Sequence, residues 1–281
     1  MQISHGSLTV PGAKIYYKVR GAGPPLLILQ GGAGDADTPD ALATTLATRF
    51  TVITFDRRGL SRSPLSDPKQ LVSIEQHAAD ALTLLDEITA DAAYVFGSSL
   101  GSLVALELVL RESGRLQRVV AHDPPLFELL SVEEQRAFRE LRSKVAEIAL
   151  CQGTRPAMRH FLVAIGVDND DREEDAEPPP SGRERARNSG FFLSRDSRAA
   201  DQYRLDLAAL MAVAPKVVPA FGRSSQACFP SRCAVALAKQ LEQPPLEFPG
   251  GHTGYVLRPR AFAERLASVL APAVPVEHCY S

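Results

Sequence analysis

The sequence predicts an α/β fold with a mostly parallel central sheet. Through the first half of the chain, short apolar runs of strand length alternate with longer segments of helical periodicity, which is the pattern of repeated β-α-β units. Residues 25–29 (PLLIL) and 51–55 (TVITF) are continuously apolar or β-branched, as expected for strands buried on both faces. The same alternation returns after residue 212. We therefore expect one core that is interrupted by an insertion.

The individual elements follow from local patterns. Residues 14–20 alternate like one strand of an early hairpin. Residues 73–88 begin with Ser73, a favourable N-cap, and repeat apolar residues at helical spacing. The other predicted strands span residues 25–29, 51–55, 92–96, 116–121, 215–221 and 245–248, and the other predicted helices span residues 39–49, 100–112, 231–241 and 259–270.

Residues 127–212 differ from the rest of the chain in composition and periodicity, because they are rich in charged residues and have helical patterns. We interpret them as a helical cap inserted into a core made of residues 1–126 and 213–281. Within the cap, residues 168–185 (DNDDREEDAEPPPSGRER) combine low hydrophobicity, mixed charge and three consecutive prolines. Such a segment is a poor core former, so we expect an exposed, mobile loop.

Composition excludes several classes of partner. The 281 residues are 45% hydrophobic and 23% charged, with a net charge of −2, which leaves no electrostatic footprint for nucleic acid or for an anionic membrane surface. The four cysteines have no CxxC spacing and the six histidines are scattered, so we expect no metal site. We find no targeting signal and no apolar run of about 20 residues. We therefore expect a cytoplasmic protein with reduced thiols.

Residues 97–101 read Gly-Ser-Ser-Leu-Gly, a G-x-S-x-G motif at the point where a predicted strand ends and a predicted helix begins. This is the context of a nucleophile elbow, in which the central serine, here Ser99, is the nucleophile. The strained turn requires glycine two positions before and two positions after that serine. Ser98 and Ser102 lack this flanking pattern. The alternative is a tight Gly/Ser turn without chemistry, and the strand–turn–helix context favours the nucleophile.

Three further motifs occur around the elbow in a fixed order. Residues 29–34 read LQGGAG, residues 55–63 read FDRRGLSRS, and residues 250–252 read GGH. Together with the elbow they resemble the α/β-hydrolase superfamily over nearly the whole length of the chain. The resemblance implies an α/β-hydrolase fold with an inserted helical cap and a Ser, acid, His triad that needs no cofactor.

The resemblance also implies an oxyanion hole made of two backbone N–H groups. By position in the motifs these belong to Gly32 and to Leu100, the residue after the nucleophile. Leu100 begins a helix, where the dipole favours negative charge. Gln30 stands where the family usually has histidine, which leaves the role of that side chain open. In the family, the residue matching Asp56 organises its loop.

His252 is the predicted general base, because it follows a predicted strand late in the chain, as the Ser, acid, His order requires. We interpret His122, beside Asp123 at a strand end, as a structural neighbour of the site. The other histidines are expected to be solvated or packing residues: His5, His77, His160 and His278.

The acid departs from the commonest family position. The loop after the predicted strand 215–221 contains no carboxylate, and no aspartate follows Asp206. Asp123, by contrast, ends the strand that follows the nucleophile helix, at the edge where open parallel sheets build their sites. We therefore predict Asp123 as the acid, although it could instead cap the next helix. Fungal lactone hydrolases that act on resorcylic macrolactones resemble this chain in placing the acid there. The late glutamates fall in helices, a strand or the tail: Glu242, Glu247, Glu264 and Glu277.

These features predict hydrolysis of a carboxylic ester, lactone or thioester of a small to medium, largely apolar compound. Phe161, Leu162, Phe191 and Phe192 give the cap apolar faces but no recognition motif. Carbon–carbon bond hydrolysis and cofactor-free halogenation are alternatives that use the same triad. A ligand receptor without catalysis is a third. Epoxide hydrolysis and dehalogenation are disfavoured, because those members of the fold use an aspartate nucleophile. The sequence does not predict an oligomeric state.

Overall fold

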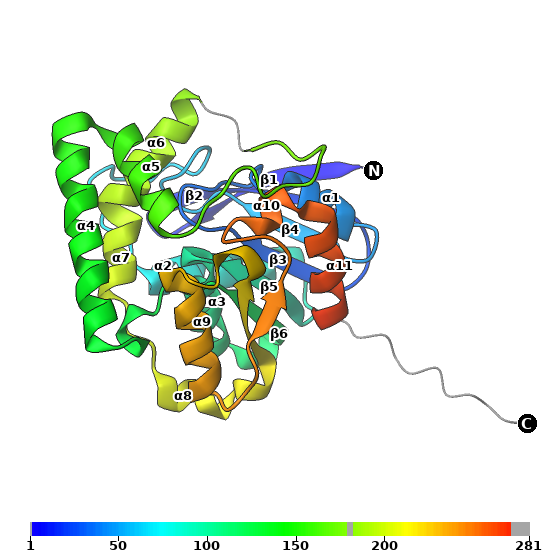
Figure 1. Cartoon of the computed structure of the whole chain (residues 1–281). Coiled ribbons are helices and arrows are strands. Elements are labelled where there is room, and N and C mark those ends of the chain that lie inside the picture. The colour runs from blue at the N-terminus through cyan, green and yellow to red at the C-terminus, as the bar shows by residue number, and fades with distance from the viewer. Residues whose placement is uncertain (1, 179–181, 271–281) are drawn as a thin grey trace, which may run out of the picture.

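A twisted sheet forms the centre of the computed structural model, which describes residues 2–178 and 182–270 (Figure 1). In this part of the chain the sheet has eight strands in the order β1-β2-β4-β3-β5-β6-β7-β8. β2 pairs antiparallel with β1 and β4, and all other neighbours are parallel. The strands are β1 (Ile3–Val10), β2 (Ala13–Arg20), β3 (Pro25–Leu29), β4 (Thr51–Phe55), β5 (Ala93–Ser98), β6 (Leu116–His122), β7 (Val217–Gly222) and β8 (Leu246–Phe248).

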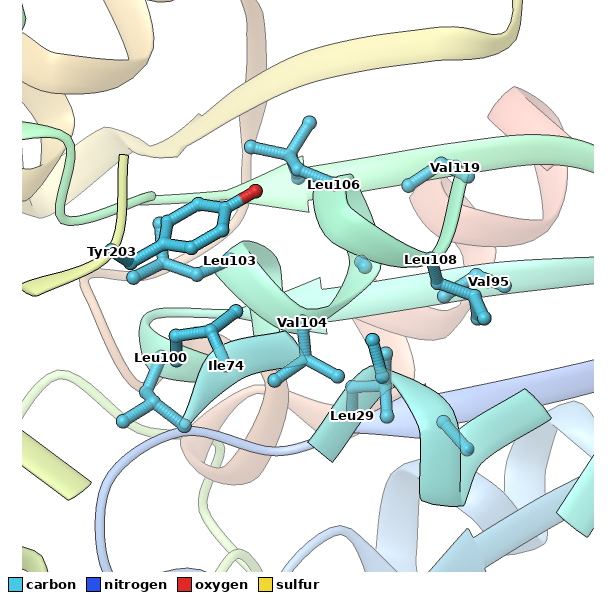
Figure 2. Close-up of a cluster of buried hydrophobic side chains, with 14 of the residues drawn as sticks. Leu29, Ile74, Val95, Leu100, Leu103, Val104, Leu106, Leu108, Val119 and Tyr203 are labelled. Carbon is cyan, nitrogen blue, oxygen red and sulfur yellow. The ribbon is translucent and has the colours of Figure 1, made fainter. Parts of the chain in front are cut away.

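Helices cover both faces of the sheet, which explains why its central strands are apolar at every position. In β3, Leu27 and Leu29 point to one face, while Leu26 and Ile28 point to the other. Figure 2 shows the first face, where Leu29 and side chains of β5 and β6 lie against the nucleophile helix. The helices on that face are α2 (Ile74–Ile88), α3 (Leu100–Arg111) and α9 (Phe229–Gln240), and those on the other face are α1 (Asp40–Leu46), α10 (Gly254–Leu257) and α11 (Pro259–Leu270).

The predicted elements of the core are confirmed. Every predicted strand overlaps an observed strand and agrees with its bounds within two residues. The hairpin partner of the predicted strand 14–20 is β1. Helix α1 ends three residues earlier than predicted, and the chain turns at Ala47. No helix in residues 2–178 and 182–270 is long and apolar enough to cross a bilayer.

A helical region is inserted between β6 and β7, as predicted (Figure 1). Its first helix is started by a capping box in which Ser131 and Glu134 satisfy each other's backbone N–H groups. A π-helical turn, Phe192–Asp196, joins α6 directly to α7. The helices of the insertion are α4 (Val132–Gln152), α5 (Thr154–Ala164), α6 (Arg183–Phe191), α7 (Ser197–Gln202) and α8 (Leu207–Ala212). The division into 1–126, 127–212 and 213–281 stays a prediction.

The predicted mobile loop, residues 168–185, includes residues 179–181, which lie outside the described residues. Before this gap the segment is tied to the core by ion pairs. Arg258 Nε donates to Asp171 Oδ1 at 2.7 Å, and Arg260 Nη2 donates to Asp175 Oδ1 at 2.6 Å. After the gap, α6 begins at Arg183. The mobility of the segment stays a prediction.

Glycine lets the nucleophile helix approach the sheet. A Cβ atom on Gly101 would lie 1.9 Å from the carbonyl oxygen of Leu29, and one on Gly97 would lie 2.4 Å from the carbonyl oxygen of Gly101. Both obstacles are backbone atoms, which cannot rotate away. The two glycines of the elbow therefore set the distance between α3 and β3.

Gly101→Ala is expected to lower the free energy of unfolding by about 2 kcal/mol or more, because the added methyl group overpacks the contact between α3 and β3. Urea unfolding measures the change. The matched control is Gly114→Ala, since a Cβ at Gly114 meets no atom within 4 Å. Equal stability of the two variants would show that the close approach at Gly101 carries no constraint.

Candidate active site

Ser99 lies in the turn between β5 and α3 with strained backbone angles, φ 54° and ψ −126°. Few residues other than glycine adopt a positive φ, and such strain persists only where the surroundings hold it in place. The Ser99 N–H donates to the carbonyl of His122 at 2.9 Å, and the hydroxyl of Ser102 donates to the Ser99 carbonyl. These bonds hold the turn that raises the Ser99 side chain above the sheet edge.

The structure brings Asp123 and His252 together, as predicted. Nδ1 of His252 donates to Oδ2 of Asp123 at 3.0 Å. Asp123 follows β6 directly, and its own N–H donates to the carbonyl of Ala220 in β7 at 2.8 Å. Ser231 Oγ donates to Oδ1 at 2.9 Å and Ser225 Oγ donates to Oδ2 at 3.4 Å. The carboxylate is therefore bound on both oxygens.

These contacts favour the ionised form of the Asp123 carboxyl group. Its side chain is fully buried, and burial by itself raises the pKa of a carboxyl group. The hydrogen bonds from His252 and Ser231 and the two neighbouring histidine rings oppose the effect of burial and hold the pKa of Asp123 below its ordinary value. Asp123 is thus ionised at neutral pH and available to accept the imidazole N–H.

Two serines of this arrangement, Ser225 and Ser231, were not predicted from the sequence. Ser225 lies in the loop after β7, where the family commonly has its aspartate, and Ser231 lies in the first turn of α9. The absence of a carboxylate from that loop was the signal that could have suggested them. The alternative acids lie elsewhere: Glu242 and Glu264 are exposed, and Glu247 pairs with Arg223. Glu277 lies outside the described residues.

Ser99 and His252 line the same cavity, which has a volume of about 60 Å³. A second cavity of about 30 Å³ also reaches Ser99, and the two share walls formed by Phe161, Ile165 and Phe192. Of the four apolar cap residues named from the sequence, three line the first cavity and one does not. Phe161, Leu162 and Phe192 line the first cavity, whereas the ring of Phe191 lies over Gly59. The further walls of the first cavity include Gly31, Gly32, Met158, Arg185 and Tyr255, and those of the second include Leu100, Phe127, Phe138 and Pro230.

The loop after β3 places Gly32 in the wall of the first cavity. Gly32 has φ +46°, and a Cβ there would meet no atom within 4 Å, so this side of the loop faces open space. Among the described residues, no protein acceptor takes the N–H of Gly32 or of Leu100. Gln30 does not line either cavity. Its Nε2 donates to the carbonyl of Phe55 at 2.6 Å, which ties the end of β3 to the end of β4.

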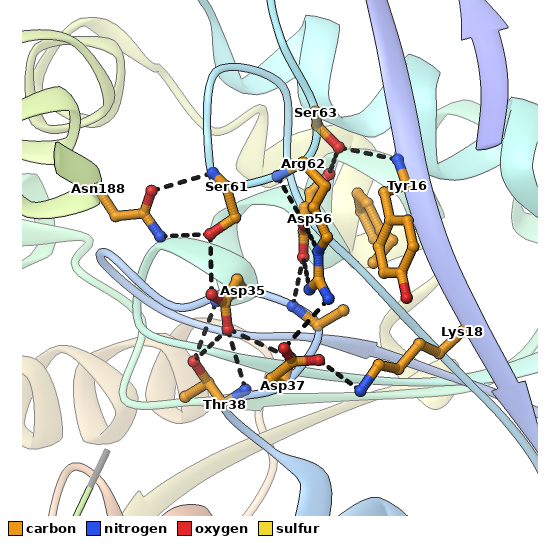
Figure 3. A network of polar contacts seen from close by, with 12 residues as sticks. Tyr16, Lys18, Asp35, Asp37, Thr38, Asp56, Ser61, Arg62, Ser63 and Asn188 are labelled. Atoms are coloured by element: carbon orange, nitrogen blue, oxygen red, sulfur yellow. Dashed lines mark hydrogen bonds and ion pairs between the residues drawn. The ribbon is translucent and has the colours of Figure 1, made fainter. Parts of the chain in front are cut away.

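Asp56 organises the adjacent loop, as predicted (Figure 3). It accepts hydrogen bonds from the N–H of Ala36 at 2.8 Å and from the N–H of Arg62 at 2.9 Å. The insertion also contacts this loop. In Figure 3 the side chain of Asn188 lies against Ser61, accepting from its N–H at 3.0 Å and donating to its hydroxyl at 2.8 Å.

The other histidines that the structure describes lie outside both cavities. His122 is fully buried among Phe96, Phe248 and Phe262, with Nδ1 3.4 Å from the hydroxyl of Ser98. His77 is buried and contacts Asp196, and His5 and His160 are exposed. His278 lies outside the described residues. In residues 2–178 and 182–270, no three or more His, Cys, Asp or Glu side chains form a group that could hold a metal ion.

Comparisons with known proteins identify the family. Residues 24–150 match the family model of the alpha/beta hydrolase fold. The chain is 38% identical over 274 residues to the uncharacterized hydrolase YraK of Bacillus subtilis, covering 96% of this chain and 97% of that protein. The chain belongs to the α/β-hydrolase family. This confirms the predicted resemblance to the α/β-hydrolase superfamily and the predicted fold.

Two further similarities are more distant. The hydrolase is 29% identical over 120 residues to zearalenone hydrolase of Bionectria ochroleuca, covering 42% of this chain and 46% of that protein. This match confirms the predicted likeness to a fungal lactone hydrolase. The structure superposes on a thermophilic esterase from Thermogutta terrifontis with a TM-score of 0.70 and 18% identity, covering 96% of this chain and 98% of the esterase. At that identity the likeness shows the fold alone.

His122 is expected to make the stability of this hydrolase depend on pH. Burial lowers the pKa of His122 from 6.5 to about 4, so the native protein leaves it neutral at pH values where the unfolded chain protonates it. The stabilisation is complete above pH 6.5 and is lost as the pH falls toward 4. Between pH 7.5 and pH 5.0 the loss is about 2 kcal/mol.

Urea unfolding of the wild type and His122→Phe at these two pH values measures this loss. The variant replaces the imidazole with a ring that suits the phenylalanines around it, and it should lose about 2 kcal/mol less than the wild type. His160→Phe, at an exposed position, should behave as the wild type. The same pH dependence in all three proteins would contradict the assignment to His122.

Proposed function

We propose that the protein is a serine hydrolase that cleaves a carboxylic ester, lactone or thioester through an acyl-enzyme. One observation carries the proposal: His252 is bound at Nδ1 by the ionised, buried Asp123 and shares a cavity wall with Ser99. This is the arrangement that nucleophilic catalysis requires, with a nucleophile, a base, and a third group that orients the base.

In the proposed reaction, Ser99 Oγ attacks the carbonyl carbon while its proton passes to Nε2 of His252. Asp123 keeps the proton on Nδ1 and stabilises the imidazolium. The bond from the carbonyl carbon to the leaving oxygen or sulfur then breaks, and His252 protonates the leaving group. Water attacks the acyl-Ser99 ester by the same route, which releases the carboxylic acid and restores the Ser99 hydroxyl.

We propose that the N–H groups of Gly32 and Leu100 bind the oxyanion that forms at each attack. Both N–H groups are without a protein acceptor within the described residues, and Leu100 begins α3, whose dipole favours negative charge. Removing one donor of such a hole lowers turnover by about 10²–10³-fold. The geometry of the loop that carries Gly32 is therefore expected to have a large effect on turnover, although a smaller one than the triad.

Apolar walls favour an apolar substrate of small to medium size. Phenyl rings and aliphatic side chains of the insertion line both cavities beside Ser99. The charged side chains of the insertion in these walls are Arg185 in the first cavity and, in the second, Arg142 and Asp201, which form an ion pair at 2.8 Å. The name of one similar protein, a zearalenone hydrolase, supports ester or lactone chemistry. Screening p-nitrophenyl esters of graded acyl length together with lactones tests this. Cleavage of charged or peptide substrates alone would contradict an apolar site.

The free thiols of Cys151, Cys228 and Cys233 accord with a reducing compartment, and we propose the cytoplasm as the place of action.

Ser99→Ala is expected to lower kcat by about 10⁶-fold, because the hydroxyls of Ser98 and Ser102 are directed to His122 and to the Ser99 carbonyl and cannot replace that of Ser99. Its melting temperature should stay near that of the wild type, since the change removes a single oxygen. Ser98→Ala is the matched control, and it should keep activity because the Ser98 hydroxyl faces His122. An active Ser99→Ala together with an inactive Ser98→Ala would reverse the choice of serine.

Asp123→Asn is expected to lower kcat by about 10⁴-fold, because an amide cannot hold the imidazole in the tautomer that accepts the Ser99 proton. Steady-state turnover and circular-dichroism melting of the purified variant measure the effect. Glu242→Gln and Glu247→Gln should have near wild-type turnover. A folded Asp123→Asn protein with normal activity would remove Asp123 from the triad.

A further inference from the structure

Three buried ionisable side chains from separate parts of the chain meet outside the proposed triad. They are Arg57 in the loop after β4, His77 in α2, and Asp196 at the end of the π-helical turn of the insertion, all at most 1% exposed. Asp196 accepts from Arg57 Nη2 at 3.1 Å through Oδ2 and from His77 Nε2 at 3.1 Å through Oδ1. Burying such charges is costly unless their geometry is well satisfied.

The other contacts of Arg57 reach the proposed oxyanion loop. Nη1 donates to the carbonyl of Gln30 at 2.6 Å, and Nη2 donates to the carbonyl of Gly32 as well as to Asp196. These two carbonyls belong to the peptide groups on either side of the one that carries the Gly32 N–H. Because each peptide group is planar, holding its two neighbours restrains the direction of that N–H.

The loop needs such a restraint from outside. Gly32 has no side chain to pack and faces open space, and glycine has more backbone freedom than any other residue. A planar guanidinium with several fixed donors is suited to holding two carbonyls at once, provided that its own orientation is fixed. Asp196 supplies the charged partner that orients it.

The π-helical turn links this network to the substrate cavity. Its first residue, Phe192, lines both cavities beside Ser99, and its last residue, Asp196, binds Arg57. A π-helical turn inside an α-helical stretch is rare and occurs mostly at functional sites. One short turn of the insertion thus contacts both the substrate space and the support of the oxyanion loop.

We propose that Asp196 is a positioning residue, which acts through Arg57 to aim the Gly32 N–H at the substrate oxyanion. The inserted helices thereby complete the oxyanion hole that the core begins. This inference rests on the proposed function, because it assigns the Gly32 N–H to the oxyanion.

The neighbouring ion pair provides a matched control. Arg58 donates to Asp80 through Nε and Nη2, both at 2.6 Å, and the pair is as deeply buried as Arg57 and Asp196. The additional contact of Arg58 is the carbonyl of Pro11, which lies in neither cavity wall. Asp80→Asn therefore makes the same chemical change at the same depth without a path to the oxyanion loop.

The first experiment measures kcat, KM and melting temperature for the wild type, Asp196→Asn and Asp80→Asn with the best p-nitrophenyl ester. Asp196→Asn is expected to lower kcat by about 10–100-fold at nearly constant KM, since a misdirected donor retains part of the 10²–10³-fold effect of a complete one. Asp80→Asn should lower the melting temperature without this loss of kcat. Equal kcat in the two variants, or a change in KM alone, would overturn the proposal.

Arg57→Lys and Arg58→Lys form a second pair for the case in which Asp196→Asn does not fold. Lysine keeps the positive charge beside Asp196, but one ammonium group does not reproduce the planar contacts to two carbonyls and a carboxylate. Only Arg57→Lys should lower kcat. Normal kcat in a folded Arg57→Lys protein would overturn the proposal.

Amide hydrogen exchange of the peptide that contains residues 30–33 separates this inference from the proposed function, because it needs no turnover. Exchange should be faster in Asp196→Asn than in the wild type and unchanged in Asp80→Asn. Unchanged exchange in Asp196→Asn overturns the link between the insertion and the loop. A wild type that cleaves no ester and whose Ser99 does not react with a fluorophosphonate contradicts the proposed function, while the exchange result still decides the link.

Discussion

The hydrogen bond from His252 to Asp123 joins two loops that are 129 residues apart in sequence. It can form only because β6, β7 and β8 are parallel neighbours, so that the loops after β6 and β8 emerge at the same edge of the sheet. The same edge carries the turn after β5 that presents Ser99. Every proposed catalytic contact therefore depends on the strand order, and the strand order depends on the helices that bury both faces of the sheet.

Placing the acid after β6 has a structural cost, and the residues around it offset that cost. A fully buried carboxylate without partners would be neutral, because desolvation favours the protonated form. Asp123 instead accepts hydrogen bonds from His252, Ser231 and Ser225. The loop after β7, which has no carboxylate of its own, thus contributes a hydroxyl that supports the carboxylate of its neighbour. The acid after β6 and the serine after β7 are therefore directly linked by a hydrogen bond.

The inserted helices both line the cavities beside Ser99 and contact loops of the core. Their apolar side chains form part of the wall of both cavities beside Ser99, and their polar side chains reach the loops of the core. Asn188 binds Ser61, Arg185 donates to the carbonyl of Ala33 at 3.1 Å, and Asp196 binds Arg57. Each of these contacts ends on a loop that follows β3 or β4. A change in the position of the insertion would therefore be transmitted to the loop that carries Gly32.

Local patterns in the sequence were sufficient to predict the α/β architecture, the strands and helices of the core, and the elbow at Ser99. Apolar periodicity and glycine spacing report burial and backbone conformation, which are local properties. The sequence also singled out His252 by its order in the chain and Asp123 by the absence of a later aspartate. These two inferences rested on the triad order that the resemblance to the α/β-hydrolase superfamily implies, and on the common edge at which parallel strands end.

Outside the proposed triad, the contacts between polar groups far apart in sequence could not be predicted and were found in the folded structure. His77 was expected to be solvated or to pack, and instead it lies in a buried network with Asp196 and Arg57. Gln30, whose role was open, binds a carbonyl of the next strand. A hydrogen bond depends on the direction of two side chains and on a separation of about 3 Å. Neither quantity is encoded in the local pattern around one residue, because both are set by how elements far apart in sequence pack against each other.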